Sequence, residues 1–181
     1  MEINDSRREE NFQEYLRLKG DQDYLDVTFD EVSGGVSAVH KEHCFDKQMG
    51  PFGCRRGDYE RHVINVLRKN GYSVILLPER MPKSVNIKQF DALFDYEMSE
   101  IKTVEGRGHW SIRTKLYDAA KQGADVVILY FPEKQLFSES RIQENWVMNN
   151  AYAESVPDMH QIKRLFVVVE DRLTEIAKPP G

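Results

Sequence analysis

The stretch from residue 90 to residue 103 reads FDALFDYEMSEIKT, and it is the most informative part of the sequence. Apolar and polar side chains alternate on both sides of the polar segment Asp95–Met98, which is the pattern of two β-strands with one face buried. Alternation places Asp91 on one face of the strand before this segment. It places Glu100 and Lys102 together on one face of the strand after it. We therefore expect a hairpin that carries these three charged side chains.

If this hairpin closes, Asp91 lies opposite or diagonal to Glu100 and Lys102, at about 5–8 Å across the strands. The two carboxylates offer the oxygen ligands that Mg²⁺ prefers when it also binds a substrate phosphate. The Lys102 ammonium group can orient a water molecule or stabilise negative charge that develops on a phosphate. An exposed hairpin with a cross-strand Glu–Lys pair has the same spacing, so the pattern alone leaves that alternative open.

The rest of the chain predicts an α/β fold. Helices are expected over residues 5–19, 58–70, 109–122, 136–153 and 170–177, a hairpin over 24–40, and strands over 72–77, 87–94, 99–104, 125–131 and 165–169. We divide the chain into an N-terminal arm of helix, hairpin and loop over residues 1–56, a core over residues 57–178 and a tail over residues 179–181.

The composition is that of a globular chain of 181 residues, with 25 basic and 30 acidic side chains and a net charge of −5. Residues 40–122 contain 15 basic and 11 acidic side chains, an excess of +4 that weakly favours an anionic partner. No apolar run approaches the roughly 20 residues of a membrane span. The first residues do not form a secretion signal, so we expect a cytoplasmic site of action and no membrane partner.

A cluster of possible metal ligands lies in the loop after the first hairpin. It consists of His40, His43, Cys44 and Cys54. Their spacing is not one of the familiar zinc-finger patterns, and two cysteines do not make a disulfide framework. We therefore expect a surface loop with two reduced thiols.

The order of charged residues and elements resembles the PD-(D/E)xK nuclease superfamily. The resemblance rests on Glu60 in the first core helix, Asp91 on a strand, and Glu100-Ile101-Lys102 on the next strand, followed by a helix and a strand. Phe90 stands where the family pattern has Pro. Over about residues 57–131, the resemblance implies a restriction-endonuclease-like core, with a mixed central sheet flanked by helices.

Short local matches resemble more closely the C-terminal tRNase domains of bacterial contact-dependent growth-inhibition toxins. The matching segments are Gly57-Asp58-Tyr59-Glu60, Asn70-Gly71-Tyr72, Leu76-Leu77-Pro78, Phe90-Asp91-Ala92, Glu100-Ile101-Lys102-Thr103 and Gln122-Gly123-Ala124-Asp125-Val126-Val127. The resemblance implies an endoribonuclease with Asp91, Glu100 and Lys102 at its centre, and with Glu60 as a helix carboxylate that approaches the site.

The helix after the hairpin supplies candidate substrate-binding residues. The resemblance points to Ser111, Arg113, Lys115 and Gln122. Three of them share one helix face with Asp118, and the apolar face consists of Ile112, Leu116, Ala119 and Ala120. A solvated helix face without a ligand gives the same pattern for Lys115 and Asp118.

These observations lead to an expected endonuclease that cleaves RNA, with tRNA preferred, in a toxin-like or mobile-element setting. Mg²⁺ or another divalent cation held by Asp91 and Glu100 is the implied cofactor, and an immunity protein is an implied partner. Two alternatives remain open at this point. One is a Mg²⁺-dependent DNA endonuclease of the same fold, and the other is a catalytically silent module that binds nucleic acid or protein.

Overall fold

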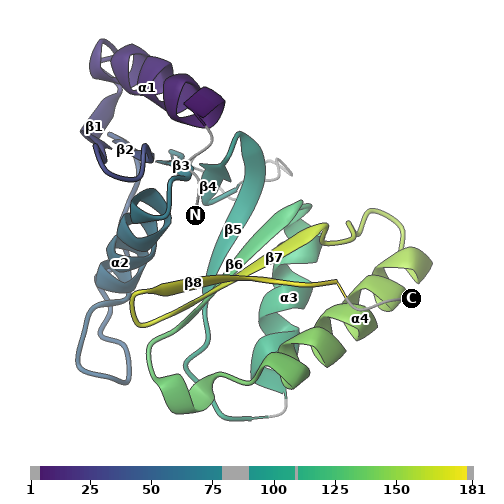
Figure 1. The fold of residues 1–181 in the computed structure, drawn as a ribbon. Helices are drawn as coiled ribbons and strands as arrows, with labels where there is room; N and C mark the ends of the chain where they lie inside the picture. The colour runs from purple at the N-terminus through teal and green to yellow at the C-terminus, as the bar shows by residue number, and fades with distance from the viewer. Residues whose placement is uncertain (1–4, 79–89, 109, 179–181) are drawn as a thin grey trace.

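The computed structural model describes residues 5–78, 90–108 and 110–178. It shows one mixed sheet flanked by helices, as Figure 1 illustrates, so the predicted α/β class is confirmed. The helices are α1 (Asp5–Lys19), α2 (Arg56–Lys69), α3 (Trp110–Gln122) and α4 (Glu139–Ser155), with a 3₁₀ turn at Lys134–Leu136. The strands are β1 (Tyr24–Phe29), β2 (Val36–His40), β3 (Ser73–Leu76), β4 (Ala92–Phe94), β5 (Glu97–Thr103), β6 (Val126–Phe131), β7 (Arg164–Val169) and β8 (Arg172–Ile176). None of these helices is long and apolar enough to cross a membrane.

The strands follow one another across the sheet in chain order, from β1 to β8. The pairs β2–β3, β5–β6 and β6–β7 are parallel, and the other neighbouring pairs are antiparallel. Each parallel pair is joined by a helix, because two parallel strands need a long crossover connection. The helices α2, α3 and α4 are these crossovers.

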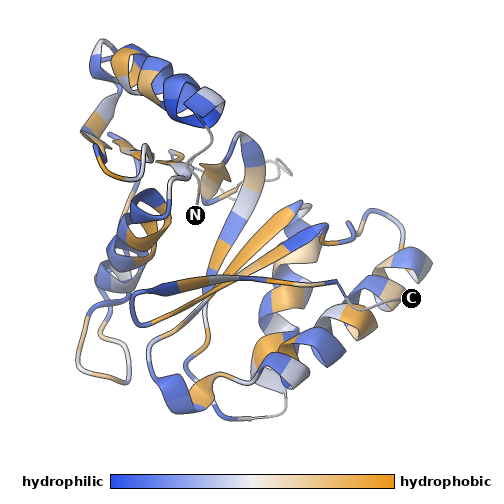
Figure 2. Ribbon diagram, viewed as in Figure 1, coloured by the Kyte–Doolittle hydropathy of each residue, from blue (hydrophilic) through white to orange (hydrophobic). Residues whose placement is uncertain are grey.

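The central strands are apolar on both faces. In β6, Val126 and Ile128 face the cluster that contains α2, whereas Val127 and Leu129 face the cluster that contains α3 and α4. Figure 2 shows β6 and β7 as largely hydrophobic ribbons. A strand that is covered by helices on both sides buries consecutive side chains, so its sequence has a continuous apolar run.

The N-terminal arm continues the same sheet. Its β1–β2 hairpin joins the core through the parallel pairing of β2 with β3. The buried side chain of Asn11 in α1 donates hydrogen bonds to the carbonyl oxygens of Gly34 (2.9 Å) and Gly71 (3.1 Å). A Cβ atom at Gly35 would lie 1.9 Å from the Arg68 carbonyl oxygen, so this turn needs glycine to approach α2. The arm is therefore closely packed against the core.

The predicted helix over residues 170–177 is wrong, because β8 occupies this segment and pairs with β7. Leu173 and Ile176 are three residues apart, which imitates the spacing of a helix stripe. Glu170 has φ 54°, and the pairing of Val169 with Arg172 leaves a two-residue turn. This turn returns the chain along β7, and the ladder of hydrogen bonds then decides the structure.

The other predicted elements are confirmed, with their ends shifted by a few residues. The largest difference concerns the strand predicted over residues 87–94. Only residues 92–94 of this segment form β4, and residues 87–89 lie outside the described part of the chain.

Candidate active site

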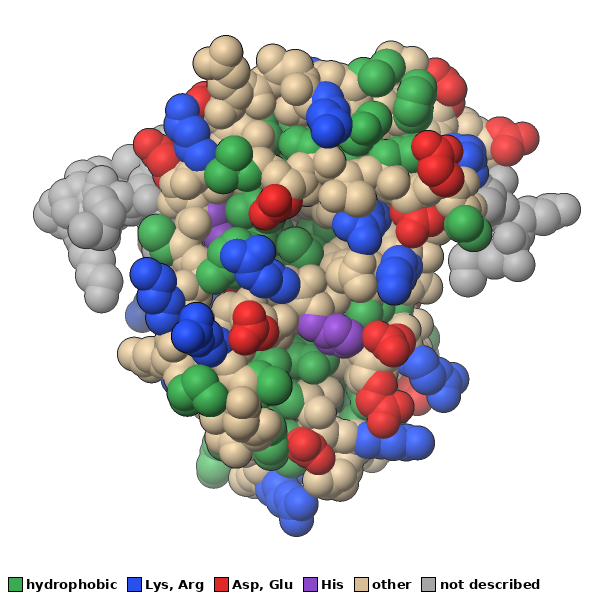
Figure 3. Space-filling model, turned by 90° about the vertical axis from the view of Figure 1, so that its left-hand side faces the viewer, with side chains coloured by type: hydrophobic (Ala, Val, Ile, Leu, Met, Phe, Trp, Pro, Cys, Tyr) green, Lys and Arg blue, Asp and Glu red, His purple; other side chains and the backbone are tan. Residues whose placement is uncertain are grey.

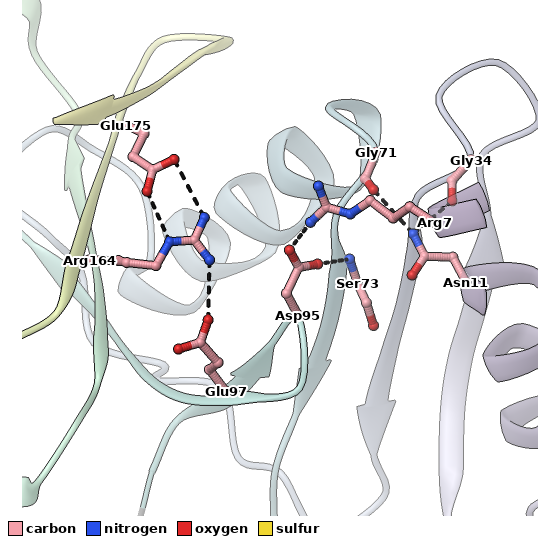
Figure 4. A network of polar contacts seen from close by, with 9 residues as sticks. All are labelled: Arg7, Asn11, Gly34, Gly71, Ser73, Asp95, Glu97, Arg164 and Glu175. Atoms are coloured by element: carbon pink, nitrogen blue, oxygen red, sulfur yellow. Dashed lines mark hydrogen bonds and ion pairs between the residues drawn. The ribbon is translucent and has the colours of Figure 1, made fainter. Parts of the chain in front are cut away.

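A tight turn fixes the hairpin of β4 and β5. Asp95 and Tyr96 form it with φ values of 47° and 66°. Two consecutive left-handed residues are the signature of a type I′ turn, whose twist matches that of the flanking strands. The Asp95 carboxylate accepts a hydrogen bond from the backbone N–H of Ser73 at 3.1 Å and forms an ion pair with Arg7 of α1 (Figure 4). Neighbouring elements thus hold the turn on both sides.

The register set by this turn brings Asp91 and Glu100 together. The Asp91 N–H donates to Glu100 Oε1 at 3.3 Å, and the Ile101 N–H donates to Asp91 Oδ2 at 3.1 Å. Lys102 Nζ forms an ion pair with Glu100 Oε2 and lies 3.7 Å from Asp91 Oδ2. The convergence that the alternation predicted is therefore confirmed, and we refer to Asp91, Glu100 and Lys102 as the charged trio.

Glu100 is the most deeply buried member of the charged trio, with 0% of its surface exposed. It lies beside Val127 of β6, on the sheet face covered by α3 and α4. Burial, the largest cause, and the nearby Asp91 carboxylate together raise the pKa of Glu100 to about 8, although Lys102 opposes the shift. Glu100 therefore holds a proton near neutral pH and can release it when another cation comes close.

Lys102 is the cation of the charged trio. Burial alone would lower its pKa, but the carboxylates of Asp91 and Glu100 outweigh burial and raise the pKa above the usual lysine value. Asp118 of α3 acts in the same direction. Lys102 is therefore charged at neutral pH, and it is available to pair with a phosphate oxygen.

The donor set of the charged trio fits a hard divalent cation. Asp91 and Glu100 would hold Mg²⁺ or a similar ion, because a buried carboxyl group that retains its proton gains from a positive partner. Among the described residues, no group of three or more His, Cys, Asp and Glu side chains could hold a metal ion. Water and a substrate phosphate would have to supply the remaining ligands, as is common for Mg²⁺.

The predicted apolar face of α3 is confirmed, because Ile112, Leu116, Ala119 and Ala120 are all buried.

The proposed substrate-binding residues have different surroundings. The Ser111 hydroxyl donates to the Gly108 carbonyl oxygen at 2.7 Å, and the Arg113 guanidinium lies 4.9 Å from the centroid of the Trp110 ring. Lys115 is half-buried. Gln122 Oε1 is buried without a hydrogen-bond partner in the part of the chain that the structure describes. Asp118 is the residue of this polar face that interacts electrostatically with Lys102.

Among the described residues, Glu60 forms no hydrogen bond or ion pair with a member of the charged trio. It lies in the second turn of α2, and its Oε2 is 3.2 Å from Nε2 of His43. The His43 side chain is only 5% exposed, and its Nδ1 lies 2.8 Å from the Leu77 carbonyl oxygen. A carbonyl oxygen can only accept, so Nδ1 must carry a proton and donate it. His43 therefore connects Glu60 to the end of β3.

The Glu60–His43 pair and the charged trio lie near the same ends of neighbouring strands, where β3 ends and β4 begins. The N–H of Leu77 donates to the Asp91 carbonyl oxygen at 3.0 Å, so the residue that holds His43 also pairs with the start of the hairpin. Arg56, in the first turn of α2, forms two hydrogen bonds of 2.9 and 2.8 Å with Glu105, just after β5. The N-terminal end of α2 is thus fastened next to the carboxyl end of β5.

His43 is a residue that sequence analysis placed wrongly. We expected a surface loop, whereas His43 is buried against Glu60, Leu77 and the edge of the Phe45 ring. Cys44 and Cys54 are exposed free thiols, as expected. No spacing in the sequence signals the partner of His43, because the loop meets α2 and β3 only in the folded chain.

Comparisons with known proteins give no relative for this arrangement. No family model, no curated protein and no solved structure matches the chain.

Proposed function

We propose that this protein is an endonuclease that cleaves phosphodiester bonds of RNA, with tRNA as its preferred substrate. The observation that supports this most strongly is the charged trio, in which a wholly buried carboxyl group lies between a second carboxylate and a lysine. Burying Glu100 costs free energy unless it gains a partner, and such costs are concentrated at functional sites. The resemblance of this segment to the PD-(D/E)xK superfamily supports the same proposal.

Each member of the charged trio has a role that its surroundings allow. The Lys102 ammonium group stabilises negative charge as it develops on the phosphate oxygens. Glu100, which is closed off from water, holds Lys102 in place by accepting a hydrogen bond from its ammonium group. Asp91 is more exposed than either, and it presents its carboxylate to an incoming ligand. A divalent cation held by Asp91 and Glu100 would polarise the scissile phosphate and lower the pKa of a bound water.

The preference for RNA comes from the resemblance to toxin tRNase domains, and so does the proposed toxin or mobile-element setting with an immunity protein. The surface charge favours local rather than general binding of nucleic acid. On the side that carries α1 and α2, Figure 3 shows Lys and Arg intermixed with Asp and Glu. This side has no broad area of positive charge. The substrate would therefore be held mainly at the strand ends where the charged trio lies.

The test is a cleavage assay on total bacterial tRNA and, separately, on plasmid DNA, each with Mg²⁺ or with EDTA. We expect discrete tRNA fragments from the wild type. The Lys102→Met variant should lower the cleavage rate by at least about 100-fold, the usual order for loss of one charge-stabilising group. Lys69→Met serves as the matched control, because Lys69 is an exposed lysine at the far end of α2.

Other outcomes of the assay decide against this proposal in different ways. Plasmid nicking that EDTA stops, with tRNA intact, would favour the DNA endonuclease of the same fold. Cleavage of neither substrate at high protein concentration would favour a silent binding module. Equal cleavage by Lys102→Met and Lys69→Met, with unchanged circular dichroism, would remove the charged trio from the reaction.

A further inference from the structure

The first residue of α3 is an exposed tryptophan. Trp110 is 60% exposed, whereas the other tryptophan, Trp146, is 2% exposed and belongs to the core. A large aromatic ring at the surface leaves a flat apolar area in water, which the face of another ring can cover. Tryptophan is also the side chain that offers the broadest flat surface to another ring.

One arginine side chain contacts this ring, and two more lie nearby along the chain or in the next helix. The Arg113 guanidinium lies 4.9 Å from the centroid of the Trp110 ring, one helical turn away. Arg107 is exposed three residues before the tryptophan, and Arg141 of α4 donates a hydrogen bond to the Gly108 carbonyl oxygen at 3.1 Å. The nearest acidic side chain in this segment, Glu105, is already paired with Arg56. Trp110 therefore has arginine close to it in the chain on both sides and on the neighbouring helix α4.

Helix α3 carries both Trp110 and the Asp118 carboxylate that interacts with Lys102 of the charged trio. Asp118, which interacts with Lys102, is eight residues further along α3. Eight residues of α-helix span about 12 Å. A single strand rises about 3.4 Å per nucleotide, so about four nucleotides cover this distance. A strand with its scissile phosphate at Lys102 would thus bring a nearby base to Trp110.

We propose that Trp110, supported by Arg113, is a stacking platform for an unpaired base of a single-stranded nucleic acid, a few nucleotides from the bond that is cut. This inference rests on the proposed function, because it takes nucleic acid to be the substrate. Bases stack on aromatic rings whatever their identity, and arginines beside the ring neutralise the flanking phosphates. A base inside a duplex is already stacked on its neighbours, so the platform selects unpaired nucleotides.

The test measures binding without cleavage. All proteins carry Glu100→Gln, and each is titrated with a 12-nucleotide single-stranded RNA, with single-stranded DNA of the same sequence and with a blunt duplex. Trp110 fluorescence is obtained as the difference between this protein and its Trp110→Phe derivative, which cancels the signal of the buried Trp146. We expect single strands to quench this difference signal. The affinity of variants that lack Trp110 is measured by the anisotropy of a fluorescein-labelled strand. We expect Trp110→Ala to weaken binding of single strands by about 5- to 150-fold, the range seen for loss of one stacked base.

Tyr117→Ala is the matched control, since Tyr117 is another exposed aromatic residue of α3. It should bind single strands as tightly as the parent. Equal quenching by duplex and single strands, equal affinity of Trp110→Ala and Tyr117→Ala, or no binding of any strand would each overturn the proposal.

The two proposals fail separately. Quenching by single strands in a protein whose wild type cuts nothing would retain the platform and reject the nuclease. Cleavage with an unchanged KM in Trp110→Ala would do the reverse. A stronger quench by RNA than by DNA would identify RNA as the source of the base.

Discussion

At the scale of single residues, Glu100 is the feature that most needs explanation. A carboxyl group with no exposed surface loses its hydration, and one lysine only partly replaces it. The Asp91 carboxylate on the facing strand adds repulsion to this cost. A sequence under selection for stability alone would favour an apolar residue at this position. The buried carboxyl group at this position therefore supports the proposed function of the charged trio.

The raised pKa of Glu100 makes folding stability depend on pH. Between the ordinary carboxyl pKa and about 8, the folded chain keeps a proton that the unfolded chain has released, so stability falls as pH rises. The loss is at most about 1.4 kcal/mol per pH unit. Glu100→Gln removes this dependence, so we expect the variant to gain stability relative to the wild type from pH 5 to pH 8.

Urea unfolding at four pH values in this range measures the difference. Glu144→Gln is the control, because Glu144 is exposed on α4, and its difference from the wild type should stay flat. A flat difference for Glu100→Gln as well would show that Glu100 is ionised throughout.

His43 gives a second prediction at this scale. His43→Ala leaves the Leu77 carbonyl oxygen and the Glu60 carboxylate without their ring nitrogens. We expect a loss of about 1–3 kcal/mol in the free energy of unfolding, the usual cost of a buried polar group left unpaired. His43→Asn places an amide N–H near the position of Nδ1 and should recover part of the loss. Denaturant titration measures both, and the exposed His160→Ala is the control; equal stability of His43→Ala and the control would mean that the ring holds neither partner.

At the scale of elements, the β4–β5 turn determines the site. It is only two residues long, and both have left-handed backbone conformations. Its register places Asp91 opposite Glu100, and a shift by one residue would turn every side chain of one strand to the other face. Asp95 is held by Ser73 and Arg7, so the core and the arm both support the turn.

Tyr96 tests this turn. A residue with a side chain is strained at φ 66°, and glycine is not. Tyr96→Ala loses the aromatic ring and keeps the strain, whereas Tyr96→Gly loses both. We expect the glycine variant to be more stable than the alanine variant by about 1 kcal/mol. Urea unfolding of the two variants gives this difference directly, and a more stable alanine variant would contradict the turn assignment.

At the scale of the whole molecule, the sheet runs without interruption from the arm into the core. Val39 of β2 packs in the same cluster as Val63 and Leu67 of α2, and β2 covers one edge of β3. The arm also contributes Arg7, which forms an ion pair with Asp95 in the turn of the β4–β5 hairpin. The two predicted regions, residues 1–56 and 57–178, therefore share one core.

A truncated chain tests this unity. Residues 57–181 alone would expose the edge of β3 and the apolar side chains that the arm covers. We expect the full chain to unfold in one cooperative transition and the fragment to show no cooperative transition. Thermal unfolding followed by circular dichroism distinguishes them, and a fragment with its own sharp transition would support an independent core.

The amino-acid sequence was sufficient to predict the features of this protein that depend on local periodicity. Alternation in residues 90–103 was sufficient to predict that the side chains of Asp91, Glu100 and Lys102 lie close together. A hairpin with a short polar turn has few possible registers. The helical stripe of α3 was equally clear, since its apolar residues recur every three to four positions.

Only the tertiary structure decided the features that depend on distant partners. The burial of His43 follows from a loop that meets α2 and β3, and β8 forms because β7 is available to pair with it. The pKa of Glu100 depends on how completely the layer over β5 excludes water, which no pattern of neighbours along the chain reports. The alternation of side chains along the sequence thus set which residues meet across the hairpin. Tertiary packing set how deeply they are buried and which distant residues they contact, because burial and long-range pairing are properties of the folded chain.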